Sequence, residues 1–368
     1  MSAYSKNKRW LFLLLPSFAF LLLLLGTINY TVDPYGFFRK DLSKQLVVPN
    51  QNFLKMRYIT KTSIPFNSFV FGSSRVGNIH VQNIKNGGRW YNMTYAGGVP
   101  QEHLMNIEYM IKKGIKINEL LIGLDEFSYA VDPEIHVQQW STKPYSPIRG
   151  ESEWLCYVRY IFRFPDVKVF QTAYKEYQIR RQPQRKQIGT FFSDYNFYGT
   201  GQGTIKELDD EINKNPEKHS QDQKFLKPYQ AYNDETDFST DALASLKRIV
   251  ELSRANGIKL TIFINPIHHT TYMATNRERL FEFKQGLSKI CDYYDFSGLN
   301  AITQNNFYYY ETSHYRPIVG DMLIRRFFTS DSNFGVLVTA RTVERHIAQQ
   351  RAEIQLYSSG SSPTNPPR

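Results

Sequence analysis

Phe69-Val-Phe-Gly-Ser-Ser-Arg-Val76 is the stretch that decides the fold of this chain. Its apolar first half is typical of a buried strand, and the glycine, serines and arginine that follow mark the end of that strand. In an α/β protein, such a turn brings hydroxyl groups to the edge of a parallel sheet where ligands bind. Far downstream, Glu311-Thr-Ser-His314 supplies an acid and a histidine three residues apart. Serine, histidine and carboxylate are the components of a nucleophilic acyl-transfer site, and a fold can assemble them from distant segments.

Apolar runs and helix-like stretches alternate along the chain around this segment. Apolar runs cover residues 67–72, 119–123 and 259–266, and the stretches 100–113 and 241–256 have helical periodicity. Strands joined by connections of helix length predict an α/β fold with a doubly wound parallel sheet.

Polar residues or glycines follow each of the predicted strands, which also include an alternating segment at residues 90–96 and a short candidate at 295–297. Because the carboxyl ends of parallel strands meet at one edge, we expect the residues that follow them to lie together there. They are Ser73 and Ser74, Gly97 and Gly98, Asp125, His268 and His269, and finally Glu311 and His314.

A charge-free apolar run near the N-terminus predicts a transmembrane anchor at residues 10–28. As a helix, this run nearly spans the hydrocarbon core of a bilayer. Lys6, Lys8 and Arg9 precede it and no basic residue follows it closely, which predicts a cytoplasmic N-terminus. The protein would then be a single-pass protein of the inner or plasma membrane, with its main domain periplasmic or otherwise extracytoplasmic. A cleaved signal peptide is the alternative, although the run is long for one and no A-x-A-like site follows it.

The alternation of strands and helices breaks down between residues 130 and 237. An insertion of this length needs structure of its own, either as a lid or substrate-binding subdomain or as an elaboration of the packing. The predicted organisation is a cytoplasmic tail (1–9), the anchor (10–28), a membrane-exit segment (29–64), an α/β domain in two parts (65–129 and 238–328), the insertion (130–237), a C-terminal helix (329–357) and a disordered tail (358–368).

Composition narrows the classes of partner. The formal charge of +11 favours anionic surroundings such as phospholipid headgroups or an acidic polymer, whereas no nucleic-acid motif or block of basic residues is present. Cys156 and Cys291 are too few for a disulfide scaffold, although an oxidising compartment would permit them to pair. His268 and His269 have no acidic residue or cysteine at ligand spacing, so we expect no metal and no cofactor.

The order and spacing of these motifs resemble those of SGNH (GDSL-type) hydrolases. The similarity is to the membrane-anchored group that modifies cell-surface polysaccharides, which includes alginate O-acetylation proteins and the D-alanine-transfer protein of teichoic-acid modification. It covers residues 65–129 and 240–328 and implies a flavodoxin-like SGNH fold. Gly72-Ser-Ser74 matches the Gly-Asp-Ser block of the family, which implies that Ser74 is the nucleophile and that Ser73 replaces the aspartate. The alternative is that both serines only cap the helix that follows.

Three further blocks of the family find a counterpart. The resemblance implies that the amide of Gly97 in Asn92–Gly97 holds the oxyanion, and Gly98 is an equally arguable candidate. Asp125 stands where the family has an oxyanion-hole asparagine, but an ionised aspartate cannot donate a hydrogen bond. Asp125 is therefore protonated, contacts the substrate or orients another group, or else the oxyanion hole relies on backbone amides. In the last block His314 would act as the base and Glu311, in place of aspartate, would orient it.

The remaining polar residues at this edge are expected to line the substrate site. This set comprises Ser73, Arg75, Gly98, His268 and His269. For Arg75 the alternatives are contact with an anionic sugar and a surface ion pair.

The resemblance implies an esterase or O-acyltransferase that acts on acyl esters, such as O-acetyl, of a cell-surface polysaccharide or glycolipid. Hydrolysis and transfer share the same acyl-enzyme intermediate, so the sequence leaves both open. The expected partners are the polymer or glycolipid, membrane lipid around the N-terminal helix and, as in the families it resembles, a multi-pass membrane protein that supplies the acyl donor. The changes at Asp125 and Glu311 keep a second class open, which is a non-catalytic SGNH-fold protein for polysaccharide binding or envelope assembly. A signal-anchored lipase is a third alternative, although no extended apolar lid sequence is evident.

Overall fold

The computed structural model describes residues 3–39, 42, 45–164, 166–181, 196–203, 206–229, 236–329 and 333–360. The chain forms two compact units. The first, which we call the anchor unit, comprises Met1–Asn50 and Tyr145–Ser193, and the second, the sheet unit, comprises Gln51–Pro144 and Asp194–Arg368.

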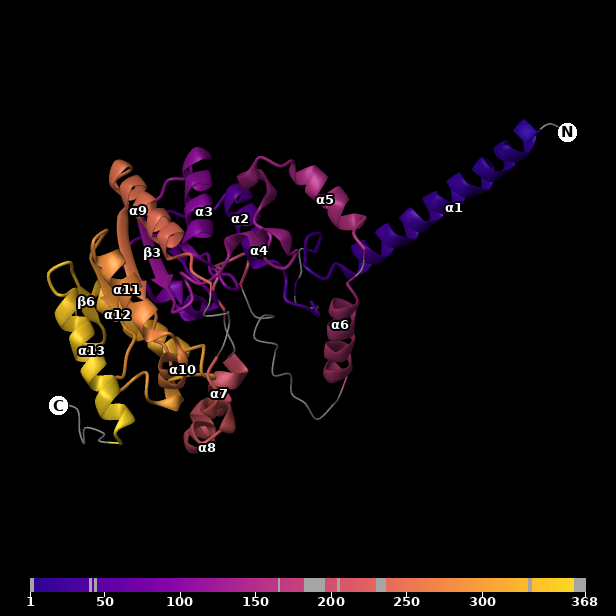
Figure 1. Cartoon of the computed structure of the whole chain (residues 1–368). Helices are drawn as coiled ribbons and strands as arrows, with labels where there is room; N and C mark the ends of the chain where they lie inside the picture. Colours follow the sequence, from indigo (N-terminus) through magenta and orange to yellow (C-terminus); the bar gives the residue numbers. More distant parts are fainter. Residues whose placement is uncertain are drawn as a thin grey trace. The chain divides into compact units, whose positions relative to one another are not determined.

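A six-stranded sheet with the order β2-β1-β3-β4-β5-β6 forms the centre of the sheet unit (Figure 1). Strands β1 to β5 are parallel, and β6 pairs with β5 in the antiparallel direction. The predicted α/β fold with a largely parallel sheet is therefore confirmed. The strands are β1 (Ser68–Phe71), β2 (Trp90–Asn92), β3 (Glu119–Leu124), β4 (Lys259–Ile264), β5 (Tyr293–Asp295) and β6 (Val336–Val338).

Helices surround this sheet, and the strands β1 and β3 are buried along their whole length. Burial on both faces explains why β1 and β3 are continuous apolar runs rather than alternating ones. The helices of the unit are α2 (Gln51–Lys61), α3 (Pro100–Lys112), α4 (Pro133–Gln138), α7 (Lys206–Lys214), α8 (Pro216–Ser220), α9 (Ser239–Ala255), α10 (His269–Ala274), α11 (Arg277–Ser288), α12 (Pro317–Phe328) and α13 (Val343–Ser358), with 3₁₀ turns η1 (Ser74–Asn78), η2 (Val81–Asn83), η4 (Gln223–Leu226) and η5 (Asn306–Tyr308).

Successive side chains of the central strands point to opposite faces of the sheet. Val70, Leu121 and Phe263 belong to a core that includes Val319 and Leu323 of α12. On α9, which contacts β4, α3 and α11, buried residues recur at helical spacing. The carboxyl ends of β1, β3 and β4 meet at one edge, because Val70 pairs with Leu121 and Ile122 pairs with Ile262.

The C-terminal segment differs from the prediction of one helix over residues 329–357. Val336–Val338 is a strand that pairs with β5, and α13 begins only at Val343. Gly335, with φ +80°, turns the chain into this strand, and a three-residue apolar run is compatible with either a helix or a strand. Helix α13 also extends to Ser358, the first residue of the predicted tail, and residues 361–368 of that tail lie outside the described residues.

The anchor unit contains α1 (Ala3–Val32), η3 (Ser146–Arg149), α5 (Glu153–Ile161) and α6 (Val167–Arg180). Residues Trp10–Val32 have a mean hydropathy of 2.5 and are long and apolar enough, as a helix, to cross a membrane. The predicted anchor at 10–28 lies within this helix. The segment expected as one insertion is divided, because residues 145–193 cluster with α1 and the remainder belongs to the sheet unit.

Candidate active site

The turn after β1 brings Ser74 to the carboxyl edge of the sheet. Gly72 has φ +155°, and a Cβ on it would lie 2.7 Å from a methyl carbon of Val76 and 2.9 Å from the carbonyl oxygen of Gly123. Only glycine fits this position without strain. Ser73 is buried, and its hydroxyl accepts a hydrogen bond from the amide of Arg75 at 3.3 Å. Capping therefore accounts for Ser73, whereas the hydroxyl of Ser74 has a different partner.

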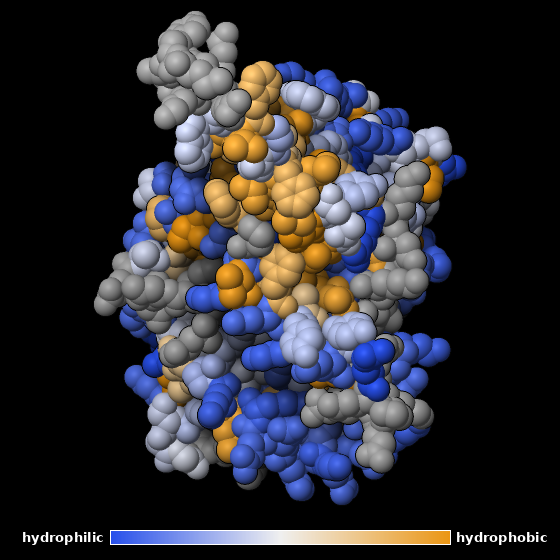
Figure 2. Space-filling view, turned by 90° about the vertical axis from the view of Figure 1, so that its right-hand side faces the viewer, coloured by the Kyte–Doolittle hydropathy of each residue, from blue (hydrophilic) through white to orange (hydrophobic). Residues whose placement is uncertain are grey.

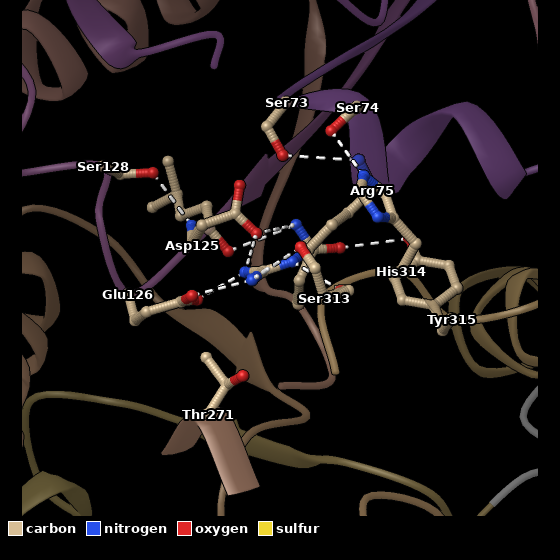
Figure 3. A network of polar contacts seen from close by, with 12 residues as sticks. Ser73, Ser74, Arg75, Asp125, Glu126, Ser128, Thr271, Ser313, His314 and Tyr315 are labelled. Atoms are coloured by element: carbon tan, nitrogen blue, oxygen red, sulfur yellow. Dashed lines mark hydrogen bonds and ion pairs between the residues drawn. The ribbon is translucent and has the colours of Figure 1, made fainter. Parts of the chain in front are cut away.

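The hydroxyl of Ser74 lies 2.8 Å from Nε2 of His314, 240 residues away in the sequence (Figure 3). Nδ1 of His314 is hydrogen-bonded to Oε1 of Glu311. With Nδ1 as the donor to the carboxylate, Nε2 is the acceptor for the serine proton. The structure thus brings all three predicted residues into one hydrogen-bonded chain.

The carboxylate of Glu311 is held by more than the imidazole. The amides of Ser313 and His314 donate hydrogen bonds to its two oxygens at 2.6 and 3.0 Å. Burial favours the neutral acid, but the hydrogen bonds and the charge of His314 outweigh it and lower the pKa of Glu311. An ionised acid at this position can stabilise a positive imidazolium.

A narrow loop between Tyr309 and Tyr315 presents Glu311 and His314. These two tyrosines form an antiparallel bridge, and the amide of Tyr310 donates to the carbonyl of His314 at 2.9 Å. The hydroxyl of Thr271 in α10 also donates to the carbonyl of Thr312 at 2.7 Å. The loop is therefore fixed from two sides.

Arg75 joins the serine turn to this loop. Its Nε donates to the carbonyl of Ser313 at 2.8 Å, and its Nη2 lies 3.3 Å from the hydroxyl of Ser313. The guanidinium binds both oxygens of Glu126 and Oδ1 of Asp125, the latter at 2.8 Å (Figure 3). It also lies 5.3 Å from the ring centre of Phe127. Burial opposes the charge, but Glu126 and Asp125 raise the pKa of Arg75 well above its usual value.

The prediction that Arg75 lines the substrate site is therefore wrong, and the ion pair that it forms is buried rather than at the surface. Its side chain is 1% exposed, so the guanidinium cannot meet a ligand in the surrounding solvent. Instead, Arg75 directly follows Ser74 and binds Ser313, the residue before His314.

Asp125 does not contribute a donor to an oxyanion hole. Its side chain is buried, and Oδ1 accepts hydrogen bonds from Arg75 and from Nδ2 of Asn265, the latter at 3.0 Å. Burial raises its pKa, and the charge of Arg75 counteracts this shift. Of the roles left open by the sequence, the orientation of another group is the one that these contacts support. Asn265, which directly follows β4, also accepts from the hydroxyl of Tyr315 at 3.1 Å.

The backbone offers two amides for an oxyanion. Among the described residues, the amides of Ser74 and Gly97 donate no hydrogen bond, whereas that of Gly98 donates to the carbonyl of Tyr95 at 3.3 Å. A Cβ on Gly98 would lie 2.9 Å from the carbonyl oxygen of Gly72, so this loop runs directly beside the serine turn. Gly97 is therefore the better oxyanion candidate, and Gly98 is needed for the close approach.

The two histidines after β4 do not reach Ser74 through any hydrogen bond between described residues. His268 is fully buried, so the prediction that it lines a substrate pocket is wrong. Its Nε2 bonds Oδ1 of Asn306 at 2.8 Å, its Nδ1 caps α10, and burial lowers its pKa to about 4. His269 is half-buried beside the carbonyl of Thr303 and lines a separate cavity of about 460 Å³.

Four residues around the site were not expected from the sequence. Three of them bind Arg75 or Asp125, namely Glu126, Ser313 and Asn265. The fourth is Tyr229, whose ring centre lies 6.3 Å from that of His314. The sequence did offer a reason to consider Glu126, because it follows Asp125 at a strand end. The other three are polar or aromatic residues for which no local pattern predicts a role in the site. Within the described part of the chain, no group of three or more His, Cys, Asp or Glu residues is placed to hold a metal ion.

The arrangement as a whole provides a hydroxyl, a base that accepts its proton, an acid that orients the base and two backbone amides. This set of groups is suited to attack on an ester carbonyl. No protein-family model matches the chain, and no curated protein is similar to it in sequence, so the functional interpretation depends on this geometry.

Proposed function

We propose that the protein is a membrane-anchored serine esterase or O-acyltransferase of the SGNH type. The observation that carries this proposal is the chain of hydrogen bonds from Ser74 through His314 to Glu311 at the carboxyl edge of the sheet. The strand order β2-β1-β3-β4-β5 supports it, since doubly wound sheets of the flavodoxin type have this order and bind ligands at this edge.

In the proposed reaction, Oγ of Ser74 attacks the ester carbonyl while Nε2 of His314 takes its proton. Glu311 stabilises the imidazolium, and the amides of Ser74 and Gly97 bind the negative oxygen of the tetrahedral intermediate. The intermediate collapses to an acyl-serine, and the departing alcohol takes the proton from His314. Water or a sugar hydroxyl then attacks the acyl-serine and gives its proton to Nε2 of His314. His314 returns that proton to Oγ of Ser74, which releases the free acid or a new ester and restores the serine.

The proposed substrate is an acyl ester, such as O-acetyl, of a cell-surface polysaccharide or glycolipid. Helix α1 would cross the inner or plasma membrane, with Lys6, Lys8 and Arg9 on the cytoplasmic side and the site on the other side. A net charge of +11 suits work beside anionic lipids or an acidic polymer. For transfer, a multi-pass membrane protein would supply the acyl donor.

One observation favours a non-catalytic binding protein as the second candidate. Asp125 occupies the position of the family's side-chain donor, and Arg75 and Asn265 already hold its carboxylate. An oxyanion would therefore depend on backbone amides alone, which reduces the electrostatic stabilisation expected from three donors.

Covalent labelling of the full-length protein in detergent separates the two candidates. A fluorophosphonate probe should label the wild type and the Ser73→Ala variant, because the Ser73 hydroxyl is buried and acts as a cap. Ser74→Ala should abolish labelling and His314→Gln should slow it by about 10²-fold or more, since the general base is lost. If the wild type is not labelled, or if Ser74→Ala is labelled equally, the enzyme proposal is wrong.

A further inference from the structure

The anchor unit exposes large apolar side chains from the start of α5 to the start of α6. The exposed fractions are 72% for Trp154, 45% for Phe162, 88% for Phe164 and 67% for Val167. We call these four residues the aromatic patch. Figure 2 shows a large area of hydrophobic residues on the face that it presents. Single exposed apolar residues are ordinary, but a group of this size beside an apolar helix indicates an interaction site.

Specific contacts fix this part of the chain to the end of α1. Nδ2 of Asn29 donates to the carbonyls of Ile161 and Arg163 at 2.6 and 2.7 Å. The hydroxyl of Tyr160 donates to Oδ1 of Asp33 at 3.0 Å, and the same carboxylate accepts three backbone amides of the turn that follows α1. The aromatic patch therefore has a defined position along α1.

That position corresponds to a membrane boundary. A helix rises 1.5 Å per residue, so about 20 residues cross a hydrocarbon core of about 30 Å. Counted from Trp10, where the apolar stretch begins, this length ends at Asn29. Phe162 lies between the two residues whose carbonyls Asn29 binds, and Phe164 follows them directly. Tyr30, which is 59% exposed, is the kind of residue that lies at such a boundary.

An apolar groove lies between α1 and the end of α5. Its volume is about 500 Å³, and its wall includes Ala19, Leu22, Leu23 and Gly26 of α1 together with Phe162. Because these residues of α1 precede Asn29, the groove is at the depth of the acyl chains whenever α1 crosses a bilayer. Lipid tails are the apolar material available at that depth.

We propose that the aromatic patch is a second membrane contact, which inserts into the lipid interface on the side where α1 ends. Its occupant is lipid because the patch continues the apolar surface of α1 and combines Trp and Phe with nearby basic residues. Arg159 has a side chain that is 55% exposed, and Lys168 is exposed as well. Such a combination is typical of segments that lie in a membrane interface. The proposal requires that α1 spans the membrane and is independent of the chemistry at Ser74.

Spin labelling tests this proposal on the full chain in phosphatidylcholine and phosphatidylglycerol vesicles that contain no other protein. The label is attached through Phe164→Cys, with Cys156 and Cys291 replaced by alanine. The matched control is Leu226→Cys in the sheet unit, which is 76% exposed and equally apolar. We expect the label at position 164 to collide more often with oxygen than with a water-soluble nickel chelate, and the control label to show the opposite preference.

A label at position 164 that prefers the nickel chelate, like the control, would overturn the proposal and favour a protein partner for the patch. A second measurement avoids the cysteine substitutions. Brominated lipids should quench the wild-type tryptophan fluorescence, and Trp154→Phe should remove a distinct part of that quenching. If the quenched fraction is the same with and without Trp154, the patch does not enter the bilayer.

Discussion

The buried arginine behind the site provides the sharpest test of how the site is held together. Arg75→Ala removes a cation whose side chain is 1% exposed and which binds Asp125 and Glu126. Both carboxylates stay in a buried environment after the substitution, with 1% and 8% of their surface exposed. We therefore expect a large loss of stability together with loss of labelling at Ser74.

The size of this loss follows from the burial of the pair. Removal of one partner of a buried ion pair costs about 3–5 kcal/mol, because the remaining charge has no compensation. A native protein has only about 5–15 kcal/mol of stability in total. At about 2 °C per kcal/mol for a domain of this size, the thermal midpoint should fall by roughly 6–10 °C.

The assay is thermal unfolding of the full-length protein in detergent, followed by circular dichroism. The control is Arg248→Ala, which breaks an exposed pair with Glu108 at 3.5 Å and should lower the midpoint by about 1 °C. Arg75→Met combined with Asp125→Asn and Glu126→Gln should recover most of the loss, because no uncompensated charge is left. If Arg75→Ala lowers the midpoint no more than the control does, the reasoning from buried charge is wrong.

Two further predictions concern other acidic residues. Hydrogen bonds lower the pKa of Glu311 despite its partial burial, so its contribution to stability is complete above the unfolded value of about 4.3 and is lost as the pH falls through the folded value. The thermal midpoint of Glu311→Gln should therefore change less with pH below about pH 4 than the midpoint of the wild type does. Equal slopes of thermal midpoint against pH for the two proteins would contradict this. Lys284 binds Asp295 at 2.8 Å with both side chains fully buried, so Lys284→Met should cost about 3 kcal/mol. The double variant with Asp295→Asn should be more stable than Lys284→Met alone, and equal thermal midpoints would refute this account.

The sequence predicted the reacting residues better than their neighbours. Ser74 and His314 stand beside local signals, namely a strand end and an acid three residues before a histidine. Whether Arg75 points outward or inward depends on the 3₁₀ turn η1, in which neighbouring residues face directions about 120° apart. A sequence does not show that turn, so the buried position of the Arg75 side chain could not be predicted.

Other differences have equally local causes. His268 was expected in a pocket, but it caps α10 through Nδ1, a role that Ser, Thr, Asp and Asn usually fill. The strand β6 has only three residues and depends on pairing with β5 for its structure. The division of the expected insertion depends on contacts such as that between Asn29 and Ile161, 132 residues apart, which no local pattern reveals.

The acid at position 125 connects these observations. Where the resembled family has an asparagine that donates to the oxyanion, this chain has a carboxylate that binds Arg75. Arg75 directly follows Ser74, and it binds Ser313, which directly precedes His314. The distance between nucleophile and base therefore depends on a charge that Asp125 and Glu126 hold in place. Asp125 therefore acts through Arg75 as a charged anchor for the Ser74–His314 pair. Asp125→Asn should accordingly weaken the contact between Ser74 and His314 rather than supply an oxyanion donor. The neutral amide cannot form the ion pair with Arg75, and its side chain stays buried.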